Sequence, residues 1–222
     1  MFIAEGDKIA KEWLMSDWNI KMIVATADWV EQNHQLVTKH NAELFTVPDH
    51  ELKNVSTLQT PNKVLLVVSM AKQTSEVGAG DWSIALEHIQ DPGNMGTIIR
   101  IADWFGIKHI IASEDCVEFF NPKVVQAAMG GHIRVSLHEA KLKELISKTE
   151  QPVYAAALDG DDIYSLTDVK PGIILIGNES KGLSQDLLDT ASQKVTIPRK
   201  GGAESLNAAV ATGILAALLT GR

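Results

Sequence analysis

The sequence predicts an α/β protein built around a mostly parallel sheet, and three observations support this prediction. The length of 222 residues is enough for one large or two small domains, and the hydrophobic content of 45% is that of an ordinary globular protein. From residue 83 onward, short apolar runs rich in Ile and Val alternate with segments of helical periodicity. Such alternation is typical of parallel strands that are covered by helices on both faces.

Residues 1–73 are predicted to form a small α/β unit of their own, because two helical patterns alternate with two apolar runs. Trp13, Trp18 and Trp29 are interpreted as core or edge residues of this unit, and not as a platform on which bases stack. The expected helices lie at residues 6–15 and 27–40, and the expected strands at 20–26 and 63–70.

Residues 84–222 are predicted to form a second, larger unit. The segment TSEVGAGDWS at residues 74–83 is small, polar and Gly-containing, so it is interpreted as the linker between the two units. The expected strands lie at residues 83–89, 107–113, 132–137, 152–158, 172–177 and 194–198, and the expected helices at 96–106, 121–131, 140–150, 184–192 and 204–219. In such sheets, ligands bind in the loops beyond the carboxyl ends of the strands.

Composition restricts the kind of function. The net charge of −8 argues against binding nucleic acid through a broad basic surface. Two of the four arginines, Arg100 and Arg199, nevertheless lie in loop–helix segments, and guanidinium is well suited to gripping phosphate locally. The single cysteine, Cys116, excludes a disulfide framework and a cysteine-rich zinc site.

Location and metal content are predicted from what the sequence does not contain. No run of eighteen apolar residues and no basic-then-apolar leader is present, so a cytoplasmic location without a membrane span is expected. The seven histidines lack the spacing of metal ligands, so no metal is expected.

The first of three notable loops begins at Asp91 and leads into a helix that ends at Gly106. Asn94 is a good N-cap, and Gly106 is a good residue to follow the last helical turn. Arg100 is expected on the face opposite the apolar stripe of this helix. The alternative interpretation is a capped helix that merely carries one exposed arginine.

The second loop, GNESKG at residues 177–182, follows an apolar strand. Its two glycines allow a backbone to approach a ligand closely. A triphosphate-binding loop needs a lysine after the second glycine, whereas Lys181 precedes it, so that function is excluded. Glu179 suits a ligand with positive character, such as a sulfonium. The alternative is a strand-to-helix turn in which Glu179 stabilises the helix N-terminus.

The third segment, at residues 193–219, is predicted to be a strand, a polar Gly-rich loop and a closing helix. Pro198 ends the strand, and Arg199 and Lys200 make the loop cationic. Glu204, Ser205 and Asn207 gather at the expected N-terminus of the helix, where backbone N–H groups are free to bind. The small residues of the helix permit close packing within the chain or across a dimer. The alternative is a terminal helix capped by Ser205.

Together the three segments resemble the SpoU family of the SPOUT RNA methyltransferases. DPGNMGTIIRIAD, IGNESKGLS and IPRKGGAESLNAAVA are similar to the three ordered motifs of that family, and NPKVVQAAMGG is similar to a further family segment. FIAEGDKIAKEWL and STLQTPNKVLLVV resemble its small substrate-binding domain. Gln126 and Ala128 depart from the pattern, since relatives often carry Arg and Ser there, and this departure predicts the loss of a cation and a hydroxyl from the RNA face.

The resemblance implies a fold, a reaction and partners. It implies an α/β fold with a deep C-terminal trefoil knot, an N-terminal substrate-binding domain, and a homodimer through the knot and the C-terminal helix. It also implies transfer of a methyl group from S-adenosylmethionine to a ribose 2′-hydroxyl, with ribosomal RNA as the preferred substrate. Two alternatives stay open: the same reaction on transfer RNA, and an RNA-binding protein that keeps the fold without turnover.

The resemblance also implies roles for individual residues. Because guanidinium is effectively always protonated, Arg100 is interpreted as an electrostatic clamp and not as a general base. Arg199 and Lys200 are candidates for contact with RNA. The other expected catalytic residues are Asn94, Glu179, Ser205 and Asn207. The expected cofactor-binding residues are Leu158, Gly177, Asn178, Glu179, Gly182, Ile197 and Leu206.

Overall fold

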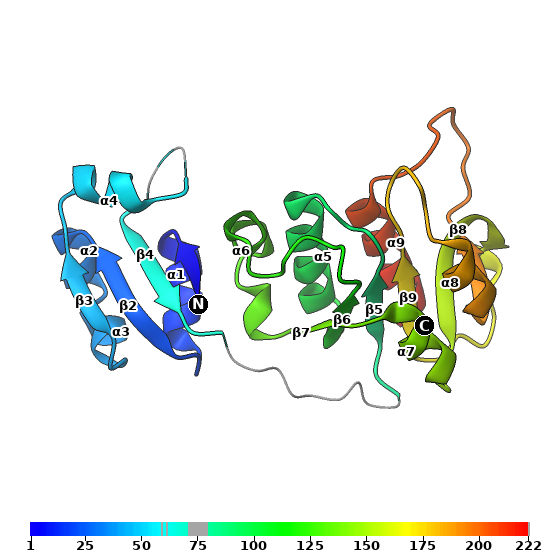
Figure 1. Ribbon diagram of the computed structural model, residues 1–222, viewed down its shortest axis with the longest axis horizontal. Helices are drawn as coiled ribbons and strands as arrows, with labels where there is room; N and C mark the ends of the chain where they lie inside the picture. Colours follow the sequence, from blue (N-terminus) through cyan, green and yellow to red (C-terminus); the bar gives the residue numbers. More distant parts are fainter. Residues whose placement is uncertain (59, 61, 71–79, 222) are drawn as a thin grey trace.

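The computed structural model describes residues 1–58, 60, 62–70 and 80–221, which form two sheets packed with helices (Figure 1). The first sheet has the strand order β1-β4-β2-β3, in which β4 is antiparallel to β1 and β2, and β2 is parallel to β3. Its elements are β1 (Phe2–Glu5), α1 (Asp7–Met15), β2 (Ile20–Ala25), α2 (Ala27–Gln32), α3 (His34–Thr38), β3 (Glu43–Thr46), α4 (Asp49–Val55) and β4 (Val64–Val68).

The second sheet has the order β10-β8-β9-β5-β6-β7, and every pairing in it is parallel. The predicted α/β class with a mostly parallel sheet is therefore confirmed. Its strands are β5 (Ser83–Leu86), β6 (His109–Ala112), β7 (Ser136–Glu139), β8 (Val153–Asp162), β9 (Ile173–Ile176) and β10 (Gln193–Thr196). Its helices are α5 (Pro92–Trp104), α6 (Pro122–Ala128), η1 (Gly131–Ile133), α7 (Leu142–Lys148), η2 (Ile163–Ser165), α8 (Gln185–Thr190) and α9 (Ala208–Thr220).

Helices cover both faces of the second sheet, as its apolar strands require. On β5, Ile84 and Leu86 face a core shared with α5, α6 and α9, whereas Ala85 faces a smaller core shared with α7 and α8. Figure 1 shows the same division, with α5 and α9 on one side of the strands and α7 and α8 on the other. The site-bearing helices α5 and α9 therefore share one face.

Several expected elements differ from the structure. The expected helix at residues 27–40 is broken at Asn33, whose side-chain amide donates to the carbonyl of Trp29 at 2.8 Å. The expected strand at 132–137 begins instead with the turn η1, and β7 follows it. The closing helix begins at Ala208 and not at Glu204. Elements β1, β3 and α4 were not predicted, and most of the expected linker, residues 74–79, lies outside the described residues.

The two sheets meet through aromatic rings and one arginine. Phe2 of β1 lies 4.6 Å from Phe120, and Trp13 of α1 lies 6.3 Å from His132, measured between ring centroids. Burial lowers the pKa of His132 to about 4, so this ring is neutral within the contact. Arg134 joins Glu12 of α1 at 2.8 Å to Asp103 of α5 at 2.8 Å. Arg134 therefore links the small unit to the helix that carries Arg100.

The three interpreted tryptophans occupy the positions expected of core or edge residues. Trp13 and Trp29 are buried, and Trp18 is partly buried against the same core. The interpretation that they do not form an exposed stacking surface is confirmed.

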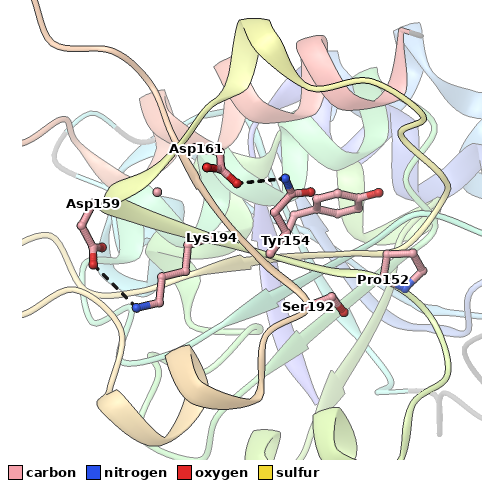
Figure 2. Close-up of a pocket in the computed structure, with 8 residues that line it drawn as sticks. Pro152, Tyr154, Asp159, Asp161, Ser192 and Lys194 are labelled. Atoms are coloured by element: carbon pink, nitrogen blue, oxygen red, sulfur yellow. Dashed lines mark hydrogen bonds and ion pairs between the residues drawn. The ribbon is translucent and has the colours of Figure 1, made fainter.

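Strand β8 pairs in parallel with β10, and near its end its backbone comes very close to that of β10. Pairing passes from Ala155–Lys194 directly to Asp161–Val195, so the intervening residues of β8 bulge out of the ladder. Figure 2 shows the surrounding hollow, of about 420 Å³, in which Asp159 reaches Lys194. A Cβ on Gly160 would lie 2.6 Å from the carbonyl carbon of Lys194, so only glycine fits at this close approach of the two backbones.

We therefore expect Gly160→Ala to lower the free energy of unfolding by about 2 kcal/mol or more, because the backbones of β8 and β10 must separate to admit a methyl group. Gly201→Ala is the matched control, since nothing lies within 4 Å of a Cβ at that position. Urea denaturation followed by circular dichroism measures both variants. Equal urea midpoints for Gly160→Ala and the wild type would show that β8 and β10 do not approach closely at Gly160.

Candidate active site

Three loops meet at the carboxyl ends of strands in the second sheet. The loops follow β5, β9 and β10. Strand β5 lies between β6, the next strand along the chain, and β9, so the strand order changes direction at β5. In open α/β sheets, such a change of direction leaves a crevice in which ligands bind. The prediction that the three loops follow the carboxyl ends of strands is confirmed.

The first loop places the Asn94 side chain between the other two loops. Asp91, and not Asn94, is the N-cap of α5, because its side-chain oxygen accepts from the Asn94 backbone N–H at 2.8 Å. The expectation that Asn94 caps the helix was therefore wrong. Pro92 at the first helical position explains the difference, since proline favours that position and leaves the residue before it as the cap. The amide of Asn94 is consequently free for longer-range contacts.

Asn94 connects Glu179 and Asn207 in one chain of hydrogen bonds. Its Nδ2 donates a short hydrogen bond to Oε1 of Glu179, and its Oδ1 accepts from Nδ2 of Asn207 at 2.8 Å. Along the chain, Glu179 lies 85 positions and Asn207 lies 113 positions from Asn94. The structure thus brings one predicted site residue from each motif into direct contact.

Asn207 also begins the last helix. Its Oδ1 accepts from the backbone N–H groups of Ala209 at 3.0 Å and Val210 at 3.3 Å. The alternative in which Ser205 caps the helix was wrong, because Ser205 lies in the preceding loop with its side chain exposed. Asn207 is held by α9 on one side and by Asn94 on the other, so its orientation is fixed.

The second loop folds on itself through Asn178. The Asn178 side-chain oxygen accepts from the backbone of Ser180 at 2.9 Å and of Lys181 at 3.1 Å, and its carbonyl accepts from Gly182 at 2.8 Å. A Cβ on Gly177 would lie 2.4 Å from the carbonyl carbon of Gly182. The loop therefore requires glycine at position 177 for its own closure, whatever ligand it approaches.

Arg100 points into solvent from the middle of α5. It is exposed, and within the described residues it makes no hydrogen bond or ion pair. Gly106, with φ of 69°, ends the helix as expected, and Ile107 donates to the carbonyl of Ala102 at 2.8 Å. An unpaired guanidinium on a rigid helix is available to an anionic ligand.

Most of the remaining predicted residues lie in the third loop itself, and Leu158 lies in β8. Leu158 is 77% exposed and Leu206 is 45% exposed, while Ile197 is partly buried against the main core. Arg199 donates to the carbonyl of Ala203 at 3.2 Å, within its own loop, and Lys200 is exposed. Exposed apolar side chains next to a polar loop are typical of a ligand site.

One expectation about the RNA face was wrong. Ala128 is 1% exposed and packs inside the main core, so a hydroxyl at that position would not face a ligand. Gln126 is partly exposed, so the absent cation still affects the surface. The close packing of α5 on α6 explains the small residue at 128, because Gly96 lies against Ala127 and Ala128.

An apolar hollow of about 460 Å³ lies between α5 and α9, next to Asn94 and Asn207. Ile101, Gly213, Ile214 and Ala217 line it, and Trp104 nearby is 83% exposed. In the part of the chain that the structure describes, no three His, Cys, Asp or Glu side chains gather as metal ligands, and no helix has the length and apolar character to cross a membrane.

The parallel α/β sheet and the loops that join Asn94, Glu179 and Asn207 bring together the three motifs on which the resemblance to the SpoU family rests. The chain belongs to the SpoU rRNA Methylase family, whose model matches residues 81–217. A second family model, the MRM3-like substrate binding domain, matches residues 1–66.

Relatives similar over nearly the whole chain support this assignment. The 23S rRNA (guanosine(2553)-2'-O)-methyltransferase RlmP of Bacillus subtilis is 27% identical, covering 99% of this chain and 88% of that protein. A putative RNA methyltransferase of the TrmH family from Porphyromonas gingivalis is 33% identical with a TM-score of 0.87, covering 98% of this chain and 88% of that one. An AdoMet-bound rRNA methyltransferase from Sinorhizobium meliloti is 30% identical with a TM-score of 0.87, covering 98% and 86%.

Proposed function

We propose that this protein transfers a methyl group from S-adenosylmethionine to a ribose 2′-hydroxyl of ribosomal RNA. The observation that carries the proposal is the hydrogen-bonded chain Glu179–Asn94–Asn207, which joins one residue from each family motif at the ligand-binding edge of the sheet. The rRNA substrate is favoured because RlmP, which matches over nearly the whole chain, is named a 23S rRNA 2'-O-methyltransferase.

The residues at this edge fit the proposed cofactor. The Glu179 carboxylate is a favourable neighbour for a sulfonium, and the exposed side chains of Leu158 and Leu206, together with Ile197, offer apolar contact. Gly177, Asn178 and Gly182 give the second loop its compact shape. When bound, the cofactor supplies an electrophilic methyl group on sulfur.

The side chains of this protein then act on the ribose. Arg100 grips the adjacent phosphate or the hydroxyl oxygen as negative charge develops on it, which is electrostatic stabilisation and needs no deprotonated guanidinium. Asn94, Asn207 and Ser205 orient the ribose. Asn94 lies in α5 and Asn207 caps α9, and attachment to these helices reduces the entropic cost of alignment. Arg199 and Lys200 contribute cationic contacts to the RNA backbone.

Three structural features accompany the proposal. Residues 1–73 form the RNA-binding domain, joined by residues 74–83 to the methyltransferase domain at 84–222; the match of residues 1–66 to a substrate binding domain supports this division. The C-terminal segment forms the deep trefoil knot that the resemblance to the family implies. The protein acts as a homodimer through the knot and α9.

The test of the function is incubation of the protein with methyl-labelled S-adenosylmethionine and separate pools of undermethylated ribosomal and transfer RNA. The expected result is label in ribosomal RNA. Label only in transfer RNA would replace the substrate, and cofactor binding without label in any RNA would identify a binding protein that lacks turnover.

The homodimer predicts the behaviour of Trp104. We expect Trp104→Glu to convert a dimer into a monomer, because it places a charge on an exposed aromatic beside the α5–α9 hollow. Phe45→Glu is the matched control, since Phe45 is a 45% exposed aromatic on β3 of the first sheet. Sedimentation equilibrium gives the masses. A monomeric wild type, or a dimeric Trp104→Glu, would contradict the proposed interface.

A further inference from the structure

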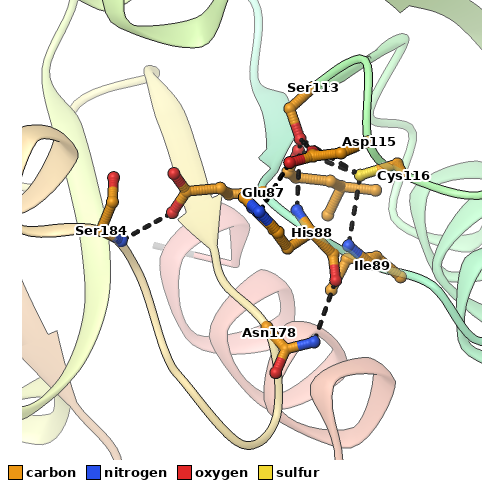
Figure 3. Close-up of polar contacts among 9 residues, drawn as sticks. Glu87, His88, Ile89, Ser113, Asp115, Cys116, Asn178 and Ser184 are labelled. Carbon is orange, nitrogen blue, oxygen red and sulfur yellow. Dashed lines mark hydrogen bonds and ion pairs between the residues drawn. The ribbon is translucent and has the colours of Figure 1, made fainter.

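Two residues directly after β5 hold both ends of the loop that carries Glu179. The buried carboxylate of Glu87 accepts from the backbone N–H of Ser184 at 2.7 Å, at the end of that loop. The backbone carbonyl of His88 accepts from Nδ2 of Asn178 at 3.0 Å, at its start. Figure 3 shows Glu87 and His88 between these two partners. Glu179 therefore lies in a loop that is attached at each end to the same two-residue segment.

His88 reaches Asn178 only because its backbone is left-handed. Its φ is 57°, in the left-handed region, which only a few per cent of non-glycine residues adopt and in which asparagine, aspartate and histidine are the most frequent of them. Such strain persists only where the surroundings impose it, and it concentrates at functional sites. The conformation thus needs an explanation from the contacts of His88.

The loop after β6 supplies those contacts. Nε2 of the His88 ring lies 2.6 Å from a carboxylate oxygen of Asp115, and the His88 backbone N–H donates to Oγ of Ser113 at 3.2 Å. Ser113 in turn donates a short hydrogen bond to Asp115. In Figure 3 the Ser113–Asp115 pair lies on the opposite side of His88 from Asn178. The ring and N–H face one loop while the carbonyl faces the other.

Cys116 completes this loop and is not a competing reactive group. Its sulfur accepts from the backbone N–H of Ile89 at 3.2 Å and lies 3.4 Å from the carbonyl of Leu86. Burial raises the pKa of the thiol, so it stays protonated and serves as a packing and hydrogen-bonding group. The loop from Ser113 to Cys116 is therefore a support for the segment after β5.

We infer that His88 is a positioning residue, whose left-handed backbone, held by Ser113 and Asp115, hooks Asn178 and thereby sets Glu179 against Asn94. This inference rests on the proposed function, because it assigns His88 an effect on the site that binds S-adenosylmethionine. It predicts that cofactor affinity depends more on the backbone conformation of residue 88 than on its side chain. The pair of the His88 ring with Asp115 is about half exposed, and such pairs contribute little stabilisation.

The experiment compares His88→Gly with His88→Val. Glycine adopts the left-handed conformation freely, whereas a β-branched residue resists it. We expect His88→Gly to keep cofactor affinity and kcat within about threefold of wild type, and His88→Val to lower both by about tenfold or more. Calorimetry with S-adenosylmethionine and methyl transfer to RNA are read separately, with thermal unfolding of each variant.

Asp168 provides the matched control, because it has φ of 54° and an exposed ion pair with Lys170, away from the loops of the site. Asp168→Val and Asp168→Gly should differ in unfolding temperature but not in cofactor affinity or kcat. If Asp168→Gly and Asp168→Val differ in activity as His88→Gly and His88→Val do, the His88 effect is one of general backbone strain, and the inference is overturned.

Asn178→Ala tests the hook itself, and it serves even where His88→Val does not fold. Alone, it should lower cofactor affinity at least as much as His88→Val, because it removes the hook and also the contacts of Asn178 with Ser180 and Lys181. In its presence, His88→Val should lower the affinity no further. Equal affinities for His88→Gly and His88→Val, or wild-type affinity in Asn178→Ala, would overturn the inference. A wild type that binds cofactor but methylates no RNA would instead overturn the proposed function, while the affinity contrast still decides the role of His88.

Discussion

Replacing Arg100 with alanine is expected to lower kcat/KM for RNA methylation by about 10²–10³-fold, the usual effect of removing one group that stabilises developing charge. The expectation follows from the position of Arg100, which is exposed on α5 and lacks a polar partner within the described residues. Because it stabilises no contact in the free protein, its loss should leave the unfolding temperature and the affinity for S-adenosylmethionine unchanged. Steady-state methyl transfer, calorimetry and thermal unfolding test these three statements.

Arg100→Lys separates charge from shape. Lysine keeps the positive charge but offers no planar fork, so kcat/KM should fall by about tenfold or more if Arg100 grips two oxygens at once. Lys148→Ala is the control for losing one exposed cation, since Lys148 lies at the end of α7 outside the site. Undiminished activity in Arg100→Lys would rule out bidentate clamping, and undiminished activity in Arg100→Ala would remove Arg100 from the mechanism.

The second large effect is expected at Asn94. Asn94→Asp replaces the amide that donates to Glu179 by a carboxylate oxygen, so two like charges would meet at hydrogen-bond distance. The link between the first and second motifs should break, and we expect kcat/KM to fall by about 10²-fold as the ribose- and cofactor-binding groups lose alignment. Calorimetry should also show weaker binding of S-adenosylmethionine.

A compensating change distinguishes alignment from a mere loss of fold. In the double variant Asn94→Asp, Glu179→Gln, the donor and acceptor exchange places, so the hydrogen bond can form again in the opposite direction. We expect the double variant to recover the unfolding temperature of the wild type, and to bind cofactor more tightly than Asn94→Asp alone. If the double variant is as destabilised as the sum of the two single changes, Asn94 and Glu179 do not interact as described.

The arrangement of the large sheet could be predicted from sequence because its strands are apolar runs separated by helices of strong periodicity. Elements β1, β3 and α4 could not, because they are short, and all four residues of β3 are exposed, so no alternation marks it. The start of α5 is marked in the sequence by Pro92, because proline at the first helical position indicates Asp91 as the cap.

The site was predictable only in part. Spacing indicated three loops at strand ends, but the contact of Asn94 with Glu179 and Asn207 joins residues distant in sequence, and no periodicity predicts such a contact. The resemblance to a family supplied that set. Neither signal indicated His88, because its left-handed backbone is imposed by Ser113, Asp115 and Asn178 and leaves no mark on the residue type.

The most direct test of the central claim is the chemical position of the transferred methyl group. After methyl transfer to ribosomal RNA, the labelled product is hydrolysed with alkali, which cleaves only where a free 2′-hydroxyl is present. The account predicts label in alkali-resistant dinucleotides, and its absence from the product of the Arg100→Ala variant. Label in mononucleotides would place the methyl group on a base and would contradict the account.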